Sequence, residues 1–240
     1  MGTMIQRYGL TEEDYRGDVF AECEKELRGN NDCLCITRPD IIKAIHKEYI
    51  DAGADIIESN TFSANRISQA EYGCEEFAAQ MAYAGAKIAR EAADEAMKEN
   101  GRKVWVAGSV GPTSKSLSLS PDVADPAFRA YSFEEMSKAY GEQIDALVRG
   151  GVDVILIETC FDALNVKAAI AGYESCSYAA SLNTNTSEPS KTRIPVMVSV
   201  SVGDRSGRTL TGQTLEAFYT SVKHAGLLRS EEHTSELQSL

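Results

Sequence analysis

The sequence has few of the features that mark several common classes of protein. Its 240 residues contain only three histidines and one tryptophan, and no Ser–His–Asp or Cys–His arrangement of a nucleophilic enzyme is evident. No apolar run approaches the roughly 18 residues of a membrane-spanning helix. The N-terminus also lacks the basic and then apolar pattern of a secretory signal. These absences favour a cytoplasmic protein without a membrane partner.

Positive charge is scarce relative to negative charge. The 24 Lys and Arg residues face 36 Asp and Glu residues, a net charge of −12, which disfavours broad attraction to nucleic acid or anionic membranes. With 43% hydrophobic and 25% charged residues, the composition is that of a globular protein able to bury a core. We therefore expect a small-molecule substrate and no nucleic-acid partner.

Six cysteines are scattered through the chain, and none follows Cys176. They do not form the dense framework of a small secreted domain, so we expect reduced thiols. Cys33 and Cys35 are separated by a single residue, which is not the usual spacing of a zinc knuckle, and no second pair follows. We interpret both as small buried hydrophobic residues and assign no metal ligand.

Short apolar segments alternate with segments of helical periodicity. We expect strands over 55–59, 103–108, 153–157 and 194–202, and helices over 39–52, 75–98, 132–149, 163–173 and 214–223. Ser132 and Glu135 have the spacing of a capping box at the start of the third of these helices. The polar segment 175–193 is expected to be a mobile surface loop.

Strands that are almost wholly apolar and alternate with helices indicate a parallel sheet covered by helices. An open doubly wound sheet usually carries a glycine-rich phosphate turn after its first strand, and no Gly-x-Gly-x-x-Gly occurs here. Polar residues instead follow successive strands, as at the mouth of a (β/α)8 barrel, where barrel enzymes have their active sites. The prediction is an α/β fold, a partial TIM barrel with about four βα units.

Four polar residues just past the expected strands are candidates for substrate binding: Glu158, Asn60, Thr61 and Ser109. Glu158 could hold a substrate ammonium group by a charge-assisted hydrogen bond. It could equally cap the following helix or pair with a cation. Asn60 and Thr61 could bind polar groups of a substrate or only satisfy the loop backbone. Ser109 begins a loop whose amides could bind an anion, or which could be only a tight turn.

Two further residues are weaker candidates. His46 lies in the amphipathic helix 39–52, and we expect a role on the helix surface and none in catalysis. Cys160 follows Glu158 by two residues and could approach the barrel mouth, but we interpret it as a packing residue.

Several ordered segments carry a family resemblance. They are MGTMI (1–5), ESNTFSAN (58–65), GSVGPT (108–113), LSPDV (119–123), GGVDVILIET (150–159), DALNVKAA (162–169) and SGRTLTGQ (206–213). With them, the chain from residue 1 to about residue 228 closely resembles the homocysteine-binding domain of cobalamin-dependent methionine synthase. The segments LSPDV, DALNVKAA and GRTLTG point to the cobalamin-dependent enzyme within the wider group of homocysteine methyltransferases.

The resemblance implies an eight-stranded barrel that transfers a methyl group from methylcobalamin, supplied by methyltetrahydrofolate, to homocysteine, giving methionine. In that family, zinc held by three cysteine thiolates binds the substrate sulfur and favours its reactive thiolate form. By resemblance, Glu158 holds the homocysteine amino group, and Asn60, Thr61 and Ser109 line the pocket. The implied partners are the cobalamin and folate domains of the same full-length chain. A barrel that uses betaine or S-methylmethionine as donor is the alternative.

The sequence also departs from this family, because none of its six cysteines falls at a zinc-ligand position. We expect residues 1–228 to be an incomplete homocysteine-binding barrel domain, cut at both ends. Residues 229–240 resemble the in-frame translation of a sequencing-library adapter, so we expect a non-native tail there. The chain itself is expected to hold neither zinc nor cobalamin and to transfer no methyl group. A non-catalytic, unfolded fragment is the remaining alternative.

Overall fold

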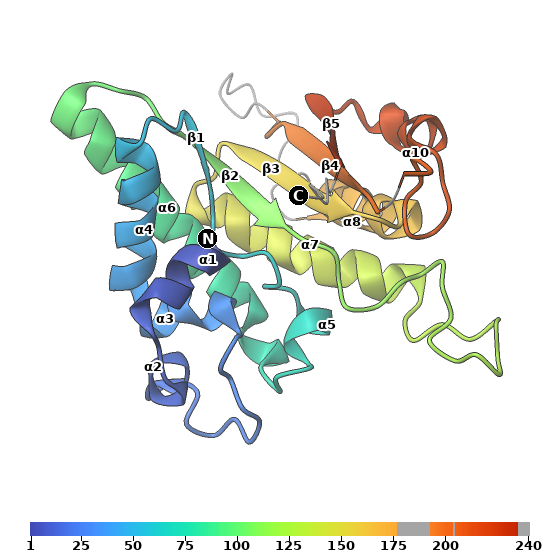
Figure 1. The fold of residues 1–240 in the computed structure, drawn as a ribbon, viewed down its shortest axis with the longest axis horizontal. Coiled ribbons are helices and arrows are strands. Elements are labelled where there is room, and N and C mark those ends of the chain that lie inside the picture. Colours follow the sequence, from blue (N-terminus) through green and yellow to red (C-terminus); the bar gives the residue numbers. More distant parts are fainter. Residues whose placement is uncertain (177–192, 204, 235–240) are drawn as a thin grey trace.

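The computed structural model describes residues 1–176, 193–203 and 205–234, and one parallel sheet organises this part of the chain (Figure 1). The strands are β1 Ile56–Glu58, β2 Trp105–Val110, β3 Val154–Cys160, β4 Val196–Val202 and β5 Arg229–Thr234. They are hydrogen-bonded to one another in sequence order. A doubly wound sheet reverses its strand order at a switch point, whereas this order advances in one direction, as in a barrel. The predicted α/β fold with a partial TIM-barrel arrangement is confirmed.

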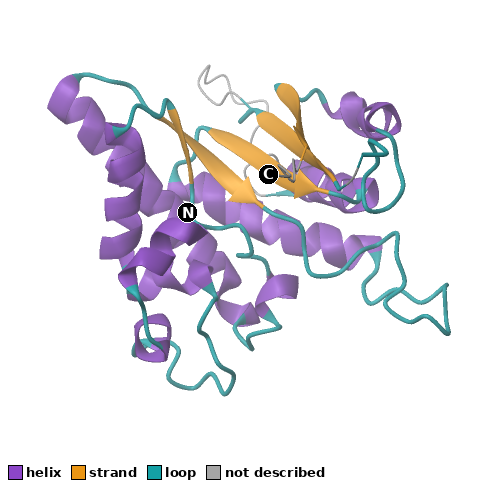
Figure 2. Ribbon diagram, in the orientation of Figure 1, coloured by secondary structure: helices purple, strands orange, loops and turns teal. Residues whose placement is uncertain are grey.

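Helices connect the strands and cover the sheet, with α7 and α8 behind it in the view of Figure 2. The longer helices are α4 Pro39–Asp51, α6 Ala78–Asn100, α7 Phe133–Gly150, α8 Ala163–Ser175 and α10 Leu215–Val222. The short helical segments are α1 Gly2–Ile5, η1 Gln6–Tyr8, α2 Glu12–Arg16, η2 Asn31–Cys33, α3 Leu34–Thr37, α5 Arg66–Gln69, η3 Glu75–Phe77 and η4 Lys223–Ala225.

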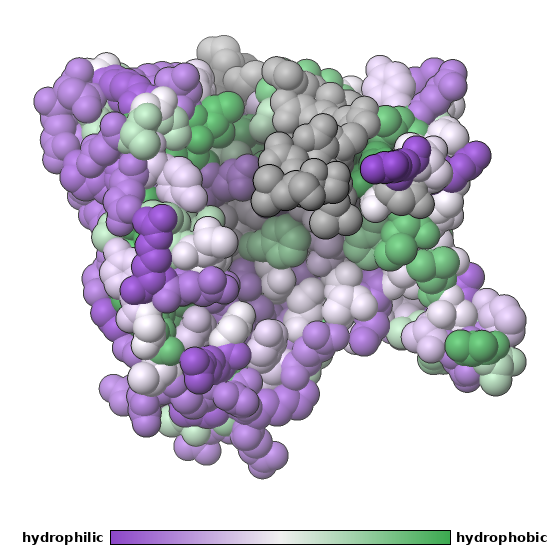
Figure 3. All heavy atoms as spheres, viewed as in Figure 1, coloured by the Kyte–Doolittle hydropathy of each residue, from purple (hydrophilic) through white to green (hydrophobic). Residues whose placement is uncertain are grey.

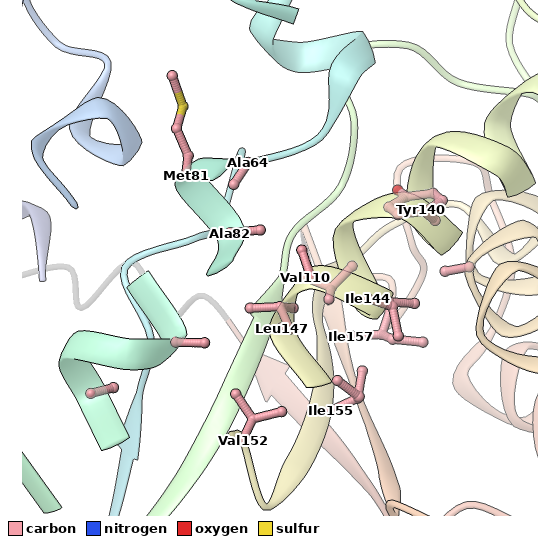
Figure 4. Close-up of a cluster of buried hydrophobic side chains, with 14 of the residues drawn as sticks. Ala64, Met81, Ala82, Val110, Tyr140, Ile144, Leu147, Val152, Ile155 and Ile157 are labelled. Atoms are coloured by element: carbon pink, nitrogen blue, oxygen red, sulfur yellow. The ribbon is translucent and has the colours of Figure 1, made fainter. Parts of the chain in front are cut away.

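Residue alternation along the strands separates two environments. Ile155 and Ile157 of β3 are buried against the helices, grouped with Ile144 and Leu147 of α7 (Figure 4). The opposite face of the sheet carries a smaller buried cluster, made by Ala107, Val154 and Leu156 with Met197 packed against it. The main core therefore lies between the sheet and its helices, and the second cluster lies on the face that a barrel turns inward.

Local sequence signals explain the helix ends. The predicted capping box at α7 is confirmed, because the Glu135 amide donates to Ser132 Oγ at 3.2 Å and the Ser132 amide donates to Glu135 Oε2 at 2.8 Å. Gly151, with φ of 96°, ends the helix in the left-handed region that favours glycine. Within the described ranges, no helix is both long and apolar enough to cross a membrane.

The strand ends differ from the sequence-based bounds in a way that matters for the site. β2 extends to Val110 and β3 to Cys160 because their residues pair with neighbouring strands, for example Val110 with Ile157 and Cys160 with Val200. Ser109 and Glu158 are therefore strand residues. β5 lies in the segment 229–240, whose foreign origin stays a prediction, and most of the predicted loop 175–193 lies outside the described residues.

Candidate functional site

A groove of about 560 Å³ lies at the carboxyl ends of the first strands. Its walls come from the loop after β1, from β2 and β3 and from the N-terminal helices, and include Asn31, Asp32, His46, Ser59, Asn60, Thr61, Ser63, Ser109 and Glu158. All four predicted substrate-binding residues thus line one groove, although their role stays a prediction. The space-filling view shows a recessed centre beside the mostly hydrophilic surface of the N-terminal helices (Figure 3).

Hydrogen bonds join the ends of β1 and β2 into one wall of this groove. The hydroxyls of Ser59 and Thr61 are 2.7 Å apart, and Thr61 Oγ1 donates to the Ser109 carbonyl at 2.8 Å. The Ser109 amide donates to Ser59 Oγ at 3.0 Å. Gln143 of α7 adds a bond from Nε2 to the Thr61 carbonyl at 2.7 Å. These four residues are at most 4% exposed, so the wall is held by buried hydrogen bonds, although Gln143 Oε1 has no hydrogen-bond partner within the described structure.

Alternation along β3 turns Glu158 to the face that carries Val154 and Leu156, and an irregularity in the strand accompanies it. The register between β3 and β4 shifts between Ile157 and Cys160, and Thr159 has φ of 56°, a left-handed conformation that is rare for a β-branched residue. Such bulges re-aim side chains and cluster near functional sites. The half-buried Glu158 carboxylate accepts a hydrogen bond from the Ser109 hydroxyl. Ser109 thereby orients the acid, and the acid retains acceptor capacity for a ligand.

Asn60 and Thr61 are largely occupied by the protein itself. Asn60 Nδ2 donates to the Asn31 carbonyl at 2.7 Å and lies 3.4 Å from Cys35 Sγ, whose thiol donates to the Asn60 carbonyl at 3.1 Å. The Thr61 side chain packs closely against Gly85 of α6, because a Cβ added to that glycine would lie only 2.4 Å from Thr61 Cγ2. Their side chains support the loop backbone, which was one of the two predicted alternatives.

Asp32 and His46 are buried titratable residues at the groove. The sequence carries no signal for Asp32, and it predicts a helix-surface position for His46. Asp32 is 6% exposed and accepts a hydrogen bond from the Ser63 amide at 3.1 Å; its burial raises the pKa of the carboxyl to about 7. The predicted helix-surface role of His46 is wrong, because its side chain is 1% exposed. Burial lowers the pKa of His46 to about 4, and within the described structure its Nε2 has no hydrogen-bond partner.

The cysteines do not provide a zinc cage of the kind that the resemblance implies. Cys33 Sγ donates to the carbonyls of Tyr15 and Asn30 at 3.2 and 2.9 Å, and Cys160 Sγ donates to the Ile157 carbonyl at 3.4 Å. Both thiols are buried, as predicted. Among the residues that the structure describes, no three His, Cys, Asp or Glu side chains are grouped closely enough to hold a metal ion. The described residues therefore do not fit a three-thiolate metal site.

A one-directional parallel sheet with polar side chains gathered at the carboxyl ends of its strands defines a barrel-type α/β enzyme domain. Solved structures of the homocysteine methyltransferase MmuM from Escherichia coli share this fold. The oxidised form has a TM-score of 0.70 and 18% identity over 97% of this chain and 70% of that chain. The metallated form has a TM-score of 0.69 and 18% identity over 97% and 71% of the two chains.

The sequence comparison assigns the family. The family model for homocysteine S-methyltransferase matches residues 1–230, and the chain belongs to this family of methyltransferases. That assignment is coarser than the sequence resemblance, which also points to a particular methyl donor.

Proposed function

We propose that the groove binds homocysteine and that Glu158 holds its ammonium group. The observation that carries this proposal is the pairing of Glu158 with the Ser109 hydroxyl at the carboxyl edge of the sheet. Among the described residues, no cation forms an ion pair with Glu158. An oriented carboxylate of this kind suits an ammonium ligand, because hydrogen bonds between ionised groups are the strong ones. Membership of the homocysteine S-methyltransferase family supports the same substrate.

The methyl donor that we propose for the complete enzyme is methylcobalamin, supplied by methyltetrahydrofolate. The segments 119–123, 162–169 and 207–212 support it through their resemblance to cobalamin-dependent methionine synthase. Zinc and cobalamin would then be cofactors of the complete enzyme, and its cobalamin and folate domains would be the partners of this domain. Betaine or S-methylmethionine is the alternative donor, and a complete gene without a cobalamin module would favour it.

Residues 1–228 are, in this proposal, the homocysteine-binding part of a cytoplasmic enzyme of methionine synthesis, and residues 229–240 are foreign to it. The resemblance of residues 229–240 to a translated adapter supports their foreign origin. Sequencing genomic DNA across the junction after Leu228 tests it. A coding sequence unlike the adapter, ending in a confirmed stop codon, would refute the foreign origin.

We predict that the chain distinguishes homocysteine from 4-mercaptobutanoate, which keeps the thiol and carboxylate but lacks the amino group. A hydrogen bond to a charged group contributes about 1.5–3 kcal/mol, so homocysteine should bind roughly 10- to 100-fold more tightly. Isothermal titration calorimetry of the reduced protein measures both affinities. Equal affinities, or no binding of either compound, would contradict the proposed site.

We also predict that the 240-residue chain retains no stoichiometric zinc and transfers no methyl group. The reason is that no three thiols of the described residues are grouped closely enough to hold a metal ion. Cys33, Cys35 and Cys160 each donate to a backbone carbonyl instead. Metal analysis after equilibration with zinc and dialysis against metal-free buffer measures the uptake. Tight binding of one zinc ion for each chain would refute this prediction.

A further inference from the structure

Two cysteines outside the groove lie in contact although they are far apart in the sequence. Cys23 belongs to the segment between α2 and η2, and Cys74 to the turn that leads into η3. Their sulfur atoms are 3.3 Å apart, and both thiols are free. Because a disulfide bond is about 2.05 Å long, the two atoms need to approach by only about 1 Å more.

Contacts on both sides of Cys23 maintain this proximity. Lys25 Nζ donates to the carbonyls of Ala70 and Glu71, each at 2.9 Å. The rings of Phe20 and Phe77 meet edge to face with centroids 4.9 Å apart. The segment that carries Cys23 is therefore docked on the turn that carries Cys74, so the sulfur contact is not an isolated encounter of two loops.

The other described thiols are poorly placed for oxidation. Cys33, Cys35, Cys160 and Cys176 are each at most 6% exposed, whereas Cys23 is half-buried. Burial raises the pKa of Cys35 to about 12, and burial also raises the pKa of Cys160. The thiolate is the reactive form, so these buried thiols react slowly at neutral pH.

Cys23 is the more accessible thiol of the pair, because it is half-buried. The Arg16 guanidinium donates to the backbone carbonyls of Cys23 and Phe20 and so holds the segment that carries Cys23 in place. Cys74, in contrast, is fully buried, and this burial raises the pKa of its thiol. Cys23 is therefore the thiol that meets a reagent from solution, and Cys74 is the thiol that follows.

We propose that Cys23 and Cys74 are a redox modification site that takes a low-molecular-weight disulfide such as glutathione disulfide as its oxidant. The Cys23 thiolate attacks one sulfur of the oxidant, forms a mixed disulfide and expels one thiolate, which takes up a proton. Cys74 then loses its proton, attacks the Cys23 sulfur and expels the second thiolate. The protein gains one S–S bond, and the oxidant is reduced to two thiols.

The disulfide would join two segments that lead into the groove walls. A reciprocal pair of hydrogen bonds already links these segments, from Asn30 Nδ2 to Gln69 Oε1 at 2.7 Å and from Gln69 Nε2 to Asn30 Oδ1 at 3.2 Å. Asn31 and Asp32 of the groove directly follow Asn30. A covalent bond at residues 23 and 74 restricts the unfolded chain more than the folded one, so the oxidised protein should unfold at a higher temperature.

The test equilibrates the complete, reduced chain in glutathione buffers of increasing oxidised fraction. Remaining thiols are then blocked under denaturing conditions, and the digested protein is analysed by mass spectrometry. We expect the loss of two of the six thiols and one cross-linked peptide pair, which contains Cys23 and Cys74. The thermal midpoint should rise together with formation of this pair.

Three variants define the order of the reaction. Cys74→Ser should accumulate the mixed disulfide on Cys23, Cys23→Ser should keep its remaining thiols free, and Cys176→Ser should oxidise like the wild type. A wild-type chain that stays fully reduced, stops at the mixed disulfide or distributes its cross-links over other cysteines would overturn the proposal. Scrambled cross-links would do so even if they arose from incomplete folding.

Discussion

Replacing Glu158 with glutamine is expected to weaken homocysteine binding by roughly 10- to 100-fold, the loss of a hydrogen bond between two charged groups. Glutamine keeps the size of the side chain and an oxygen that can accept from the Ser109 hydroxyl. The substitution removes only the negative charge, which in our proposal binds the ammonium group of the substrate. Calorimetric titration with homocysteine measures the change directly.

A second prediction concerns binding of the analogue 4-mercaptobutanoate, which lacks the amino group, to the same Glu158→Gln variant. Affinity for 4-mercaptobutanoate should change little in Glu158→Gln, so the preference for homocysteine should disappear. Glu134→Gln is a matched control, because Glu134 is an exposed carboxylate on α7, away from the groove lining. If Glu158→Gln weakens both ligands equally, or neither, the carboxylate does not bind the ammonium group.

Replacing Asp32 with asparagine is expected to increase the free energy of unfolding by up to about 4 kcal/mol above pH 7. Burial raises the pKa of Asp32 from 3.8 to about 7 in the folded protein. Between pH 3.8 and about pH 7, Asp32 has released its proton in the unfolded chain but still holds it in the folded chain. The contribution of Asp32 to stability therefore falls as the pH rises through this range, and asparagine removes that cost.

Denaturant unfolding of wild type and Asp32→Asn from pH 4 to pH 8 measures this effect. The difference in the free energy of unfolding between the two proteins reports on Asp32 alone. Other carboxylates, such as Glu12 and Asp40, have lowered pKa values, so their contributions to stability rise with pH in both proteins and cancel in the difference. The difference should grow with pH and level off above pH 7. Asp18→Asn, at an exposed position, is the control. A difference that is constant or shrinks with pH would show that Asp32 is not held neutral by burial.

The predictable part of the fold came from features that are local in the sequence. Apolar strands alternating with helices predicted the parallel sheet, and the capping box predicted the start of α7 at Ser132. Polar residues directly after successive strands predicted which side chains would gather. Parallel strands bring their carboxyl ends to one edge, and Asn60, Thr61, Ser109 and Glu158 do line one groove there.

The parts that escaped prediction depend on contacts between distant segments. His46 follows Ile42 by one helical turn, so it lies on the buried stripe of α4, but the pattern alone does not show what covers that stripe. The bulge at Thr159 arises from pairing between β3 and β4. Asp32 has no periodic or motif signal, and its burial follows from packing against the loop that contains Ser63.

A crystal structure of this chain with bound homocysteine would show whether Glu158 holds the ammonium group. We predict that the ligand lies in the groove with its ammonium nitrogen about 3 Å from a Glu158 carboxylate oxygen, while Ser109 still donates to the same side chain. Homocysteine bound elsewhere, or bound in the groove with its ammonium group turned away from Glu158, would contradict the account.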